Sequence, residues 1–242
     1  MLVEVDGFIL SEVAYGETSK VINVFTYQYG LIGIMCKGAK GLKSKNRVST
    51  MRLTYAKFNI KYKKDKLSTL ISADIINPLK LIKSDIILVS FLSFLSELTE
   101  QVIKQSNQYK SIYDNFINAI LKINEGLDPV VITNILEIKY LDYLGILFSL
   151  DSCVVCGNKN NIVTIDADKG GFVCKNCVAN EVIVDIKVIK MMRMYYYVKI
   201  EGIKDIKIDD GIIKSINMFL DMYYDRYAGL YLNSKDFLKK LL

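Results

Sequence analysis

The chain has 242 residues, 51% of them hydrophobic, which is enough for one large domain or for two to three small ones. It has no histidine, which excludes Ser-His-Asp and Cys-His catalysis and the HExxH metalloproteases, and no phosphate-binding loop, so no nucleotide cofactor is expected. The N-terminus has no signal-peptide pattern, and the longest apolar run is far shorter than the roughly 18 residues of a membrane span, so we expect a soluble, cytoplasmic protein.

The positive charge is concentrated in one segment. Residues 37–66 hold eleven basic residues and one acid, a segment charge of +10. Because the net charge of the whole chain is +6, the remaining residues carry −4. Such a concentration is typical of a surface that contacts nucleic acid, although runs of charge are also common on ordinary solvated faces.

The first 76 residues have the pattern of short β-strands. Five strands are predicted, over residues 3–13, 20–27, 31–37, 54–63 and 67–76, with a basic loop over 38–51. Five short strands in about 75 residues favour a small closed barrel, the five-stranded OB-fold. In the fourth strand the residues alternate, so that Ala56, Phe58, Ile60 and Tyr62 form a core side.

The opposite side of this strand, with the basic loop, is the candidate nucleic-acid surface. Lysines follow phosphates, and an aromatic ring offers a platform to any base. The candidate phosphate contacts are Lys37, Lys40, Lys43, Lys45, Arg47, Lys57, Lys61 and Lys63. Tyr55 is a candidate for base stacking, but a packed ring is an equally good interpretation of this residue.

From Leu79 onward the pattern becomes helical. We predict one buried helix over 79–106, a second over 109–123 and a third over 129–144, the third with Asp128 as its N-cap. Two further helices are expected over 185–200 and 209–227, and a short last helix is expected to be capped by Ser234.

Two Cys-x-x-Cys pairs interrupt the helical region and predict a metal site. Cys153 and Cys156 form the first pair, Cys174 and Cys177 the second, and the residues between them predict a hairpin. Four thiolates would close the coordination sphere of one structural Zn²⁺ per chain. The alternatives are an iron–sulfur centre, redox-active pairs or a disulfide clip.

These predictions combine into an α+β multidomain protein. Residues 1–78 form the OB-fold barrel, residues 79–150 and 181–242 form an all-α domain, and residues 151–180 form a four-cysteine zinc-finger insertion. The fifth cysteine, Cys36, lies in an apolar strand pattern and is expected to be a buried core thiol.

Several stretches resemble the RecO family of bacterial recombination and DNA repair proteins. They are GFIL (7–10), YGETSK (15–20), KGAK (37–40) followed by KSK (43–45), LDYLG (141–145), DSCVVCG (151–157), GGFVC (170–174) and NSKDFL (233–238). The resemblance implies binding of single- and double-stranded DNA and annealing of complementary strands. It also implies action with RecR and with the acidic C-terminal tail of single-stranded-DNA-binding protein, to help load RecA.

Three other functions remain open on the sequence alone. A basic OB-fold with a zinc module suits RNA as well as DNA. A purely structural interaction protein would depend on its helical domain instead of the basic segment. An enzyme would need grouped carboxylates, but the pairs Asp166/Asp168 and Asp209/Asp210 lie in predicted turn and cap positions where aspartate is expected anyway.

Overall fold

The computed structural model describes residues 1–242, which form two compact units. The first unit comprises residues 1–125 together with 232–242, and the second comprises residues 126–231. The chain therefore leaves the first unit after Glu125 and returns to it at Leu232. The narrower division at residues 78, 150 and 180 stays a prediction.

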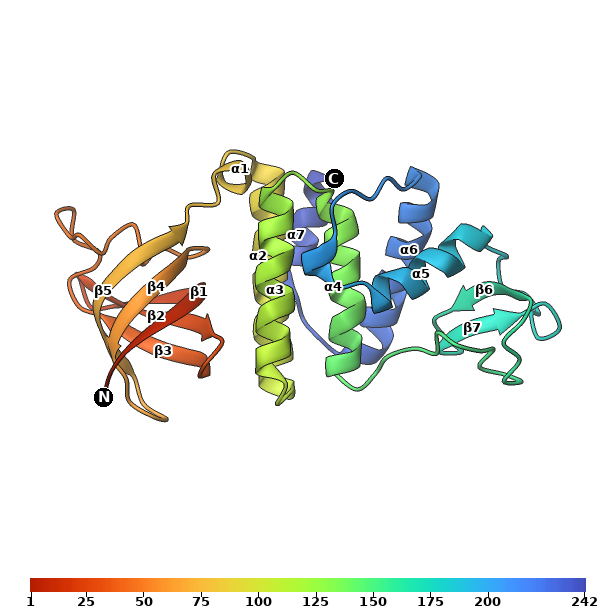
Figure 1. The fold of residues 1–242 in the computed structure, drawn as a ribbon, viewed down its shortest axis with the longest axis horizontal. Helices are drawn as coiled ribbons and strands as arrows, with labels where there is room; N and C mark the ends of the chain where they lie inside the picture. Colours follow the sequence, from red (N-terminus) through yellow and green to blue (C-terminus); the bar gives the residue numbers. More distant parts are fainter. The chain divides into compact units, whose positions relative to one another are not determined.

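The first unit begins with a closed barrel of five strands, which confirms the predicted OB-type architecture (Figure 1). The strands are joined in the order β1-β2-β3-β5-β4, and all neighbours are antiparallel except β3 and β5. Their bounds are β1 Leu2–Tyr15, β2 Ser19–Thr26, β3 Gly30–Cys36, β4 Tyr55–Lys61 and β5 Ser68–Asn77.

Alternation along the strands fills the barrel with aliphatic and aromatic side chains, among them Ile22, Ile34 and Phe58. Cys36 is one of these core residues, as predicted, and burial raises its pKa to about 12. A buried thiol with a raised pKa is chemically inert. The barrel cysteine is therefore a packing residue.

Aromatic rings join the barrel to the helices of the same unit. Phe8 of β1 meets Phe116 edge-on with ring centroids 5.1 Å apart, and Phe25 of β2 meets Tyr113 in the same way at 5.2 Å. Phe116 and Tyr113 belong to α3 (Tyr109–Asn124). Edge-to-face pairs of this kind add to the hydrophobic stabilisation from buried area.

The predicted single helix over 79–106 is wrong, because the chain forms two helices there. They are α1 (Lys80–Lys83) and α2 (Ile86–Gln105). Asp85 between them is extended, and its carboxylate accepts hydrogen bonds from the backbone N–H groups of Ile87 and Leu88, so it acts as an N-cap. The start of α2 is also not buried, since Ile86 is 63% exposed.

By length and hydropathy, α2 is the one helix of the chain that could cross a membrane. Half of its most apolar window is buried within the structure, and it packs against α1, α3 and α7 (Asn233–Leu241). A core helix meets the same criteria of length and hydropathy, so burial accounts for this composition.

The last helix, α7, is capped differently from the prediction. Ser234 lies inside the first turn, and the N-cap position belongs to Leu232, which offers no side-chain cap. Glu97 of α2 takes over the role, because its carboxylate accepts hydrogen bonds from the backbone N–H of Ser234, at 2.8 Å, and from the Ser234 hydroxyl. A residue distant in sequence thus fixes the start of α7.

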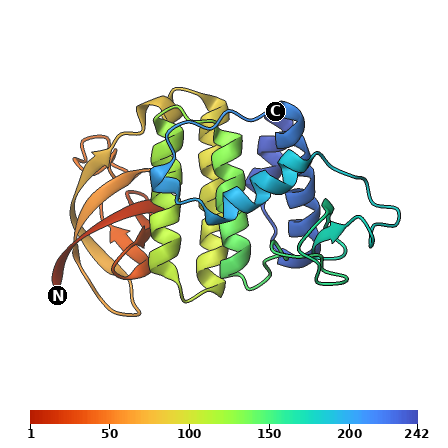
Figure 2. The ribbon, with the colours of Figure 1, turned by 45° about the vertical axis from the view of Figure 1, so that its right-hand side comes forward.

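The second unit combines three helices with a hairpin (Figure 2). The helix α4 (Pro129–Tyr143) starts at the predicted N-cap Asp128, and the helices that follow the hairpin start at Asp185 and Asp209. Both of these later helices are shorter than predicted, with a π-turn after the second. The elements are β6 Ile162–Asp166, β7 Gly171–Cys174, α5 Ile186–Tyr197, a 3₁₀ turn Ile200–Gly202, α6 Asp210–Tyr223 and the π-turn Tyr224–Ala228.

We expect Glu97→Ala to loosen α7 while leaving the barrel intact. Removing a capping acceptor costs about 1 kcal/mol of stability, so amide hydrogen exchange should speed up over residues 233–241. Glu100→Ala is the matched control, because Glu100 lies on the same helix but pairs only with Lys104. Equal exchange over residues 233–241 in the two variants would contradict the capping role of Glu97.

Candidate metal centre and nucleic-acid surface

The four cysteines of the two Cys-x-x-Cys pairs come together at the base of the β6–β7 hairpin. The Sγ atoms of Cys153, Cys156, Cys174 and Cys177 all lie within 4.8 Å of one another. The hairpin strands match the predicted arms closely. The hairpin therefore brings the second pair back to the first, as the spacing predicted.

The distances suit one metal ion. Cys156 Sγ and Cys174 Sγ are 3.7 Å apart. Thiolates bound at about 2.3 Å to one tetrahedral ion lie about 3.8 Å apart, whereas a disulfide would bring two sulfurs to about 2.05 Å. The set of four sulfurs fits a closed tetrahedral site without an open position for substrate, which is the arrangement of a structural centre.

The four sulfurs influence one another's protonation. Burial alone would raise the pKa of Cys153, but N–H groups of Cys174, Cys156 and Val155 point at its sulfur and bring the pKa down to about 6. In contrast, the pKa of Cys177 is raised to about 12, mainly by a hydrogen bond with the neighbouring Cys156 sulfur and also by burial. Four thiolates so close together need a positive ion to offset their mutual repulsion.

Glycine shapes the centre at two positions. Gly157 follows the first cysteine pair with φ 74°, a left-handed conformation that suits a residue without Cβ. At Gly171, with φ 150°, an added Cβ would lie 2.6 Å from the backbone oxygen of Ser149. Ser149 forms a bridge to this glycine, so the chain before the first cysteine is held directly against the hairpin.

Helix α5 packs against β6 of the hairpin that carries the centre. The guanidinium of Arg193 lies 5.1 Å from the ring centroid of Phe172, a residue that stands between the two cysteine pairs in the sequence. The Nε of Arg193 donates a hydrogen bond to the Leu150 carbonyl at 2.8 Å. The Tyr197 hydroxyl contacts the Asp151 carboxylate at 3.3 Å. Sequence reasoning missed these supports, because the partners are more than 20 residues apart and share no motif.

The basic loop between β3 and β4 is a chain of turns held against the barrel. Ala39 is buried in the barrel core, and the Lys40 N–H donates to the Thr18 carbonyl at 2.8 Å. The predicted phosphate contacts of this loop all point to solvent. They are Lys37, Lys40, Lys43, Lys45 and Arg47.

On β4 the candidate residues lie in different surroundings. Lys61 is exposed at the end of β4, and Lys63, which lies beyond the strand, is exposed as well. Lys57 forms an ion pair with Glu4 at 3.0 Å and lies in register between Asp6 and Asp74, all of which raise its pKa. The carboxylates of Glu4, Asp6 and Asp74 thus offset the positive charge of Lys57.

Tyr55 also lies apart from the basic loop. Its side chain is half-buried beside Tyr113 of α3, and burial raises its pKa. It pairs in register with Phe8, whose ring packs on α3. Its suggested role in base stacking stays a prediction, and its neighbours here are protein side chains.

A closed five-stranded barrel of OB type, followed by helices that carry a four-cysteine centre, defines the structural class of this protein. A family model described as the N-terminal part of recombination protein O matches residues 1–79, and a model described as its C-terminal part matches residues 83–236. The chain belongs to the RecO family of DNA repair proteins, as its sequence stretches suggested.

Curated relatives match over the full chain. DNA repair protein RecO of Halalkalibacterium halodurans is 30% identical over 244 residues, which cover 100% of this chain and 96% of the relative. The proteins of the same name from Bacillus pumilus and Bacillus cereus (strain AH187) are 28% and 29% identical, covering 100% of this chain and 95% and 98% of the relatives.

We expect Cys174→Ser to abolish stoichiometric metal binding. Native mass spectrometry of the unsubstituted protein should show one ion per chain, since the four sulfurs form one closed site, and the variant should lose it. Cys36→Ala is the control, because this thiol lies in the barrel core. An ion retained equally by both variants would show that the metal is held elsewhere.

Proposed function

We propose that this chain is a non-enzymatic mediator of recombinational DNA repair in the RecF pathway. It binds single- and double-stranded DNA and anneals complementary strands. The observation that carries the proposal is the exposed basic loop of residues 37–47 on an OB-type barrel, in a chain of the RecO family.

Annealing of this kind needs no reaction chemistry. Two strands repel each other through their phosphates, and a basic surface that neutralises both releases counterions and lets base pairing proceed. The exposed loop residues Lys37, Lys40, Lys43, Lys45 and Arg47 supply this charge, with Lys61 and Lys63 as neighbours. Lys57 contributes least, because three carboxylates already surround it.

The metal ion of the four-cysteine centre is Zn²⁺ in this proposal, one per chain, with a structural role. An all-thiolate set at tetrahedral spacing is the preferred site of zinc, and the four sulfurs leave no room for a cluster of several iron ions. The ion would hold the β6–β7 hairpin and the two cysteine pairs in place.

The partners follow from the family. We propose that the chain acts with RecR and with the acidic C-terminal tail of single-stranded-DNA-binding protein, and helps load RecA onto coated strands. The work would take place in the cytoplasm, on the nucleoid when DNA is damaged. The basic loop faces the DNA in this scheme, and the helical regions meet the proteins.

Neutralising the basic loop should flatten the salt dependence of DNA binding. Each lost phosphate contact on a single strand lowers the slope of log affinity against log salt by about 0.7, so changing all five loop cations to glutamine should lower it by up to roughly 3.5. Titrations of single-stranded DNA at several salt concentrations measure this slope.

A charge-matched control variant is available in the second unit. It replaces five exposed lysines, Lys187, Lys190, Lys204, Lys207 and Lys214. The control should keep the original slope, and an equal fall in both variants would assign binding to net charge instead of the loop. Matched RNA oligonucleotides test the competing RNA function, which gains if RNA binds more tightly than DNA of the same sequence.

The annealing role is tested on two complementary oligonucleotides coated with single-stranded-DNA-binding protein. We expect annealing when the coating protein has its acidic tail and much slower annealing when the tail is removed. Annealing of naked strands only would keep the DNA-binding function and remove the partner. Absence of annealing on both substrates would refute the mediator function.

A further inference from the structure

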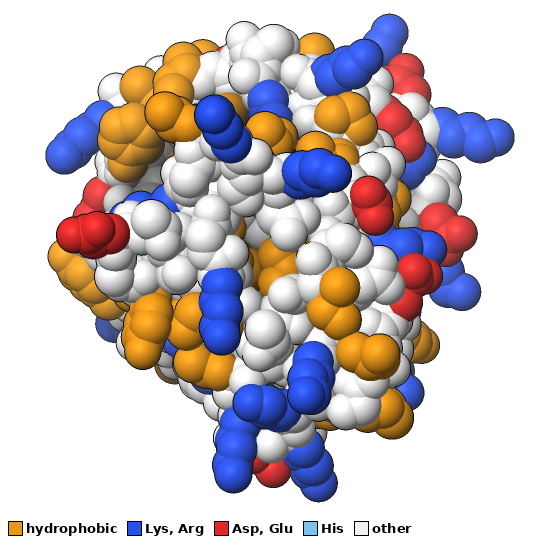
Figure 3. Space-filling model, turned by 90° about the vertical axis from the view of Figure 1, so that its left-hand side faces the viewer, with side chains coloured by type: hydrophobic (Ala, Val, Ile, Leu, Met, Phe, Trp, Pro, Cys, Tyr) orange, Lys and Arg blue, Asp and Glu red, His pale blue; other side chains and the backbone are white.

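The basic loop carries a hydrophobic side chain at the tip of a turn. Leu42 is 84% exposed, a larger fraction than any other large hydrophobic residue of the chain. The Gly41 carbonyl accepts a hydrogen bond from the Ser44 N–H at 3.0 Å, so Leu42 and Lys43 are the two central residues of this turn. On the barrel side of the molecule, hydrophobic side chains are exposed between basic ones (Figure 3). The turn therefore presents a hydrophobic knob, Leu42, with a lysine beside it.

Contacts at both ends of the loop hold the knob in place. The Lys40 N–H donates to the Thr18 carbonyl at 2.8 Å, and the Leu53 N–H donates to the Ile9 carbonyl at 3.0 Å. Between these anchors, hydrogen bonds within successive turns keep the loop compact. Leu42 is thus presented in a fixed conformation, which lowers the entropy cost of inserting it into a partner.

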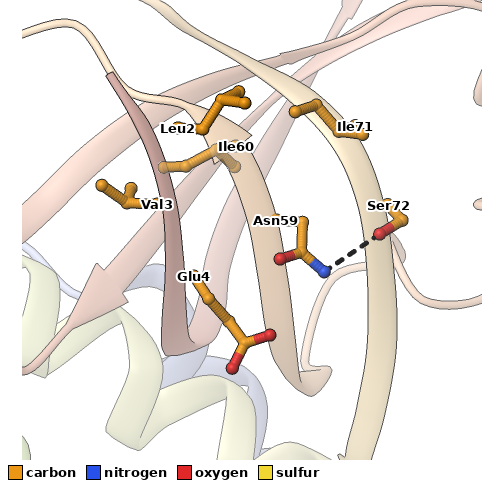
Figure 4. Close-up of a pocket in the computed structure, with 7 residues that line it drawn as sticks. All are labelled: Leu2, Val3, Glu4, Asn59, Ile60, Ile71 and Ser72. Carbon is orange, nitrogen blue, oxygen red and sulfur yellow. Dashed lines mark hydrogen bonds between the residues drawn. The ribbon is translucent and has the colours of Figure 1, made fainter.

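A shallow pocket of about 370 Å³ lies elsewhere on the barrel, where β4 runs between β1 and β5 (Figure 4). Leu2 and Ile71 are exposed and form its apolar sides. Asn59 donates its amide nitrogen to the Ser72 hydroxyl at 3.1 Å, which leaves the amide oxygen as an acceptor. The Glu4 carboxylate is a second acceptor of this pocket. The pocket therefore suits an aliphatic side chain that has a cation beside it.

The surroundings of the pocket have a negative charge balance. Glu4 and Asp6 lie on β1 and Asp74 lies on β5, with Lys57 and Lys61 on β4 between them. Three carboxylates against two lysines leave a charge of −1, whereas residues 37–47 of the loop hold five basic residues and no acid, a charge of +5. The two surfaces are therefore complementary in charge, and both have an apolar centre.

The loop and the pocket of one chain are separate. No loop residue lines the pocket, and the loop is anchored at Ile9 and Thr18. Because a strand rises about 3.3 Å per residue, the five residues from Glu4 to Ile9 already span roughly 16 Å. A compact loop held at that distance meets such a pocket on a second molecule.

We propose that two copies of this chain associate head to tail, with Leu42 of one copy in the pocket of the next and its neighbouring lysines beside Glu4 and Asp74. The contact joins two different surfaces, so a dimer keeps one free loop and one free pocket, and longer assemblies can form. The contact itself does not rest on the proposed DNA-binding function. It uses the same loop, however, so a second copy and DNA compete for these residues.

Sedimentation equilibrium measures this association. The unsubstituted protein should be monomeric at low micromolar concentration and should form dimers and longer assemblies at about 100 μM, because so small a contact is weak. Leu42→Ser and Ile71→Ser should each weaken the association about tenfold or more, since each removes one side of the apolar contact. Val182→Ser is the matched control, because it removes another exposed hydrophobic side chain, in the second unit, and should leave the association unchanged.

A mixture of the two variants identifies the contact as head to tail. The Leu42→Ser variant keeps an intact pocket and the Ile71→Ser variant keeps an intact loop, so the mixture should form one-to-one dimers and no longer assemblies. A mixture that stays monomeric would refute the contact, as would single variants that associate as strongly as the unsubstituted protein. An unsubstituted protein that is monomeric at about 100 μM would refute it too. Circular dichroism confirms that each variant is folded.

Oligothymidine distinguishes a failure of this inference from a failure of the proposed function. An oligothymidine of about 10 nucleotides, within the site size of one OB-fold, should dissolve the assemblies because it occupies the loop. If the mixture dimerises and the oligonucleotide leaves the dimer intact, the contact stands and the loop is not the DNA-binding surface. If the mixture stays monomeric while the five-glutamine loop variant loses DNA affinity, the contact is wrong and the DNA-binding function stands.

Discussion

The aromatic contacts between the barrel and α3 decide which parts of the barrel surface are available. Phe8 and Phe25 point outward from β1 and β2, where a solvated barrel would carry polar residues, and Phe116 and Tyr113 cover them. Tyr55 lies at the margin of the same contact. Any ligand of the barrel must therefore use the remaining surface, which includes the exposed basic loop of residues 37–47.

The second unit depends on a different kind of constraint. Its hairpin has only two short strands, β6 and β7, with a small cluster of buried apolar side chains that includes Ile162, Phe172 and Val173. An isolated two-stranded hairpin is only marginally stable in water, so a metal ion that links the four sulfurs would supply much of the missing stability. Gly171 and Arg193 show that the surrounding chain is built to match this centre closely.

Local features of the sequence predicted much of this structure. The spacing of the four cysteines, the alternation of β4 and the cap at Asp128 depend on neighbouring residues, and the structure confirms each of them. The error over residues 79–106 arose because two local signals, the apolar pattern and the capping aspartate, predict different structures there. Helix α1 ends at Lys83, and Asp85 begins α2 although the residues around it are apolar, because its carboxylate accepts hydrogen bonds from the free N–H groups of Ile87 and Leu88.

Long-range features could not be predicted. The sequence shows that Lys57 points away from the barrel core, but only the strand register reveals Asp6 and Asp74 on either side of it. Similarly, Ser234 is a good capping residue by type, and its engagement by Glu97 depends on how α7 packs on α2. The position of a side chain on a strand is local information, whereas its neighbours across the sheet are set by the fold.

The return of the chain to its first unit has a consequence for folding during synthesis. The barrel and the helices α1 to α3 emerge from the ribosome early. Helix α7, whose first turn is capped by Glu97 of α2, is made only after residues 126–231. The first unit is therefore completed after the whole second unit has been translated. Until then the surface of α2 on which α7 packs stays uncovered, so the apolar contacts between these two helices form last.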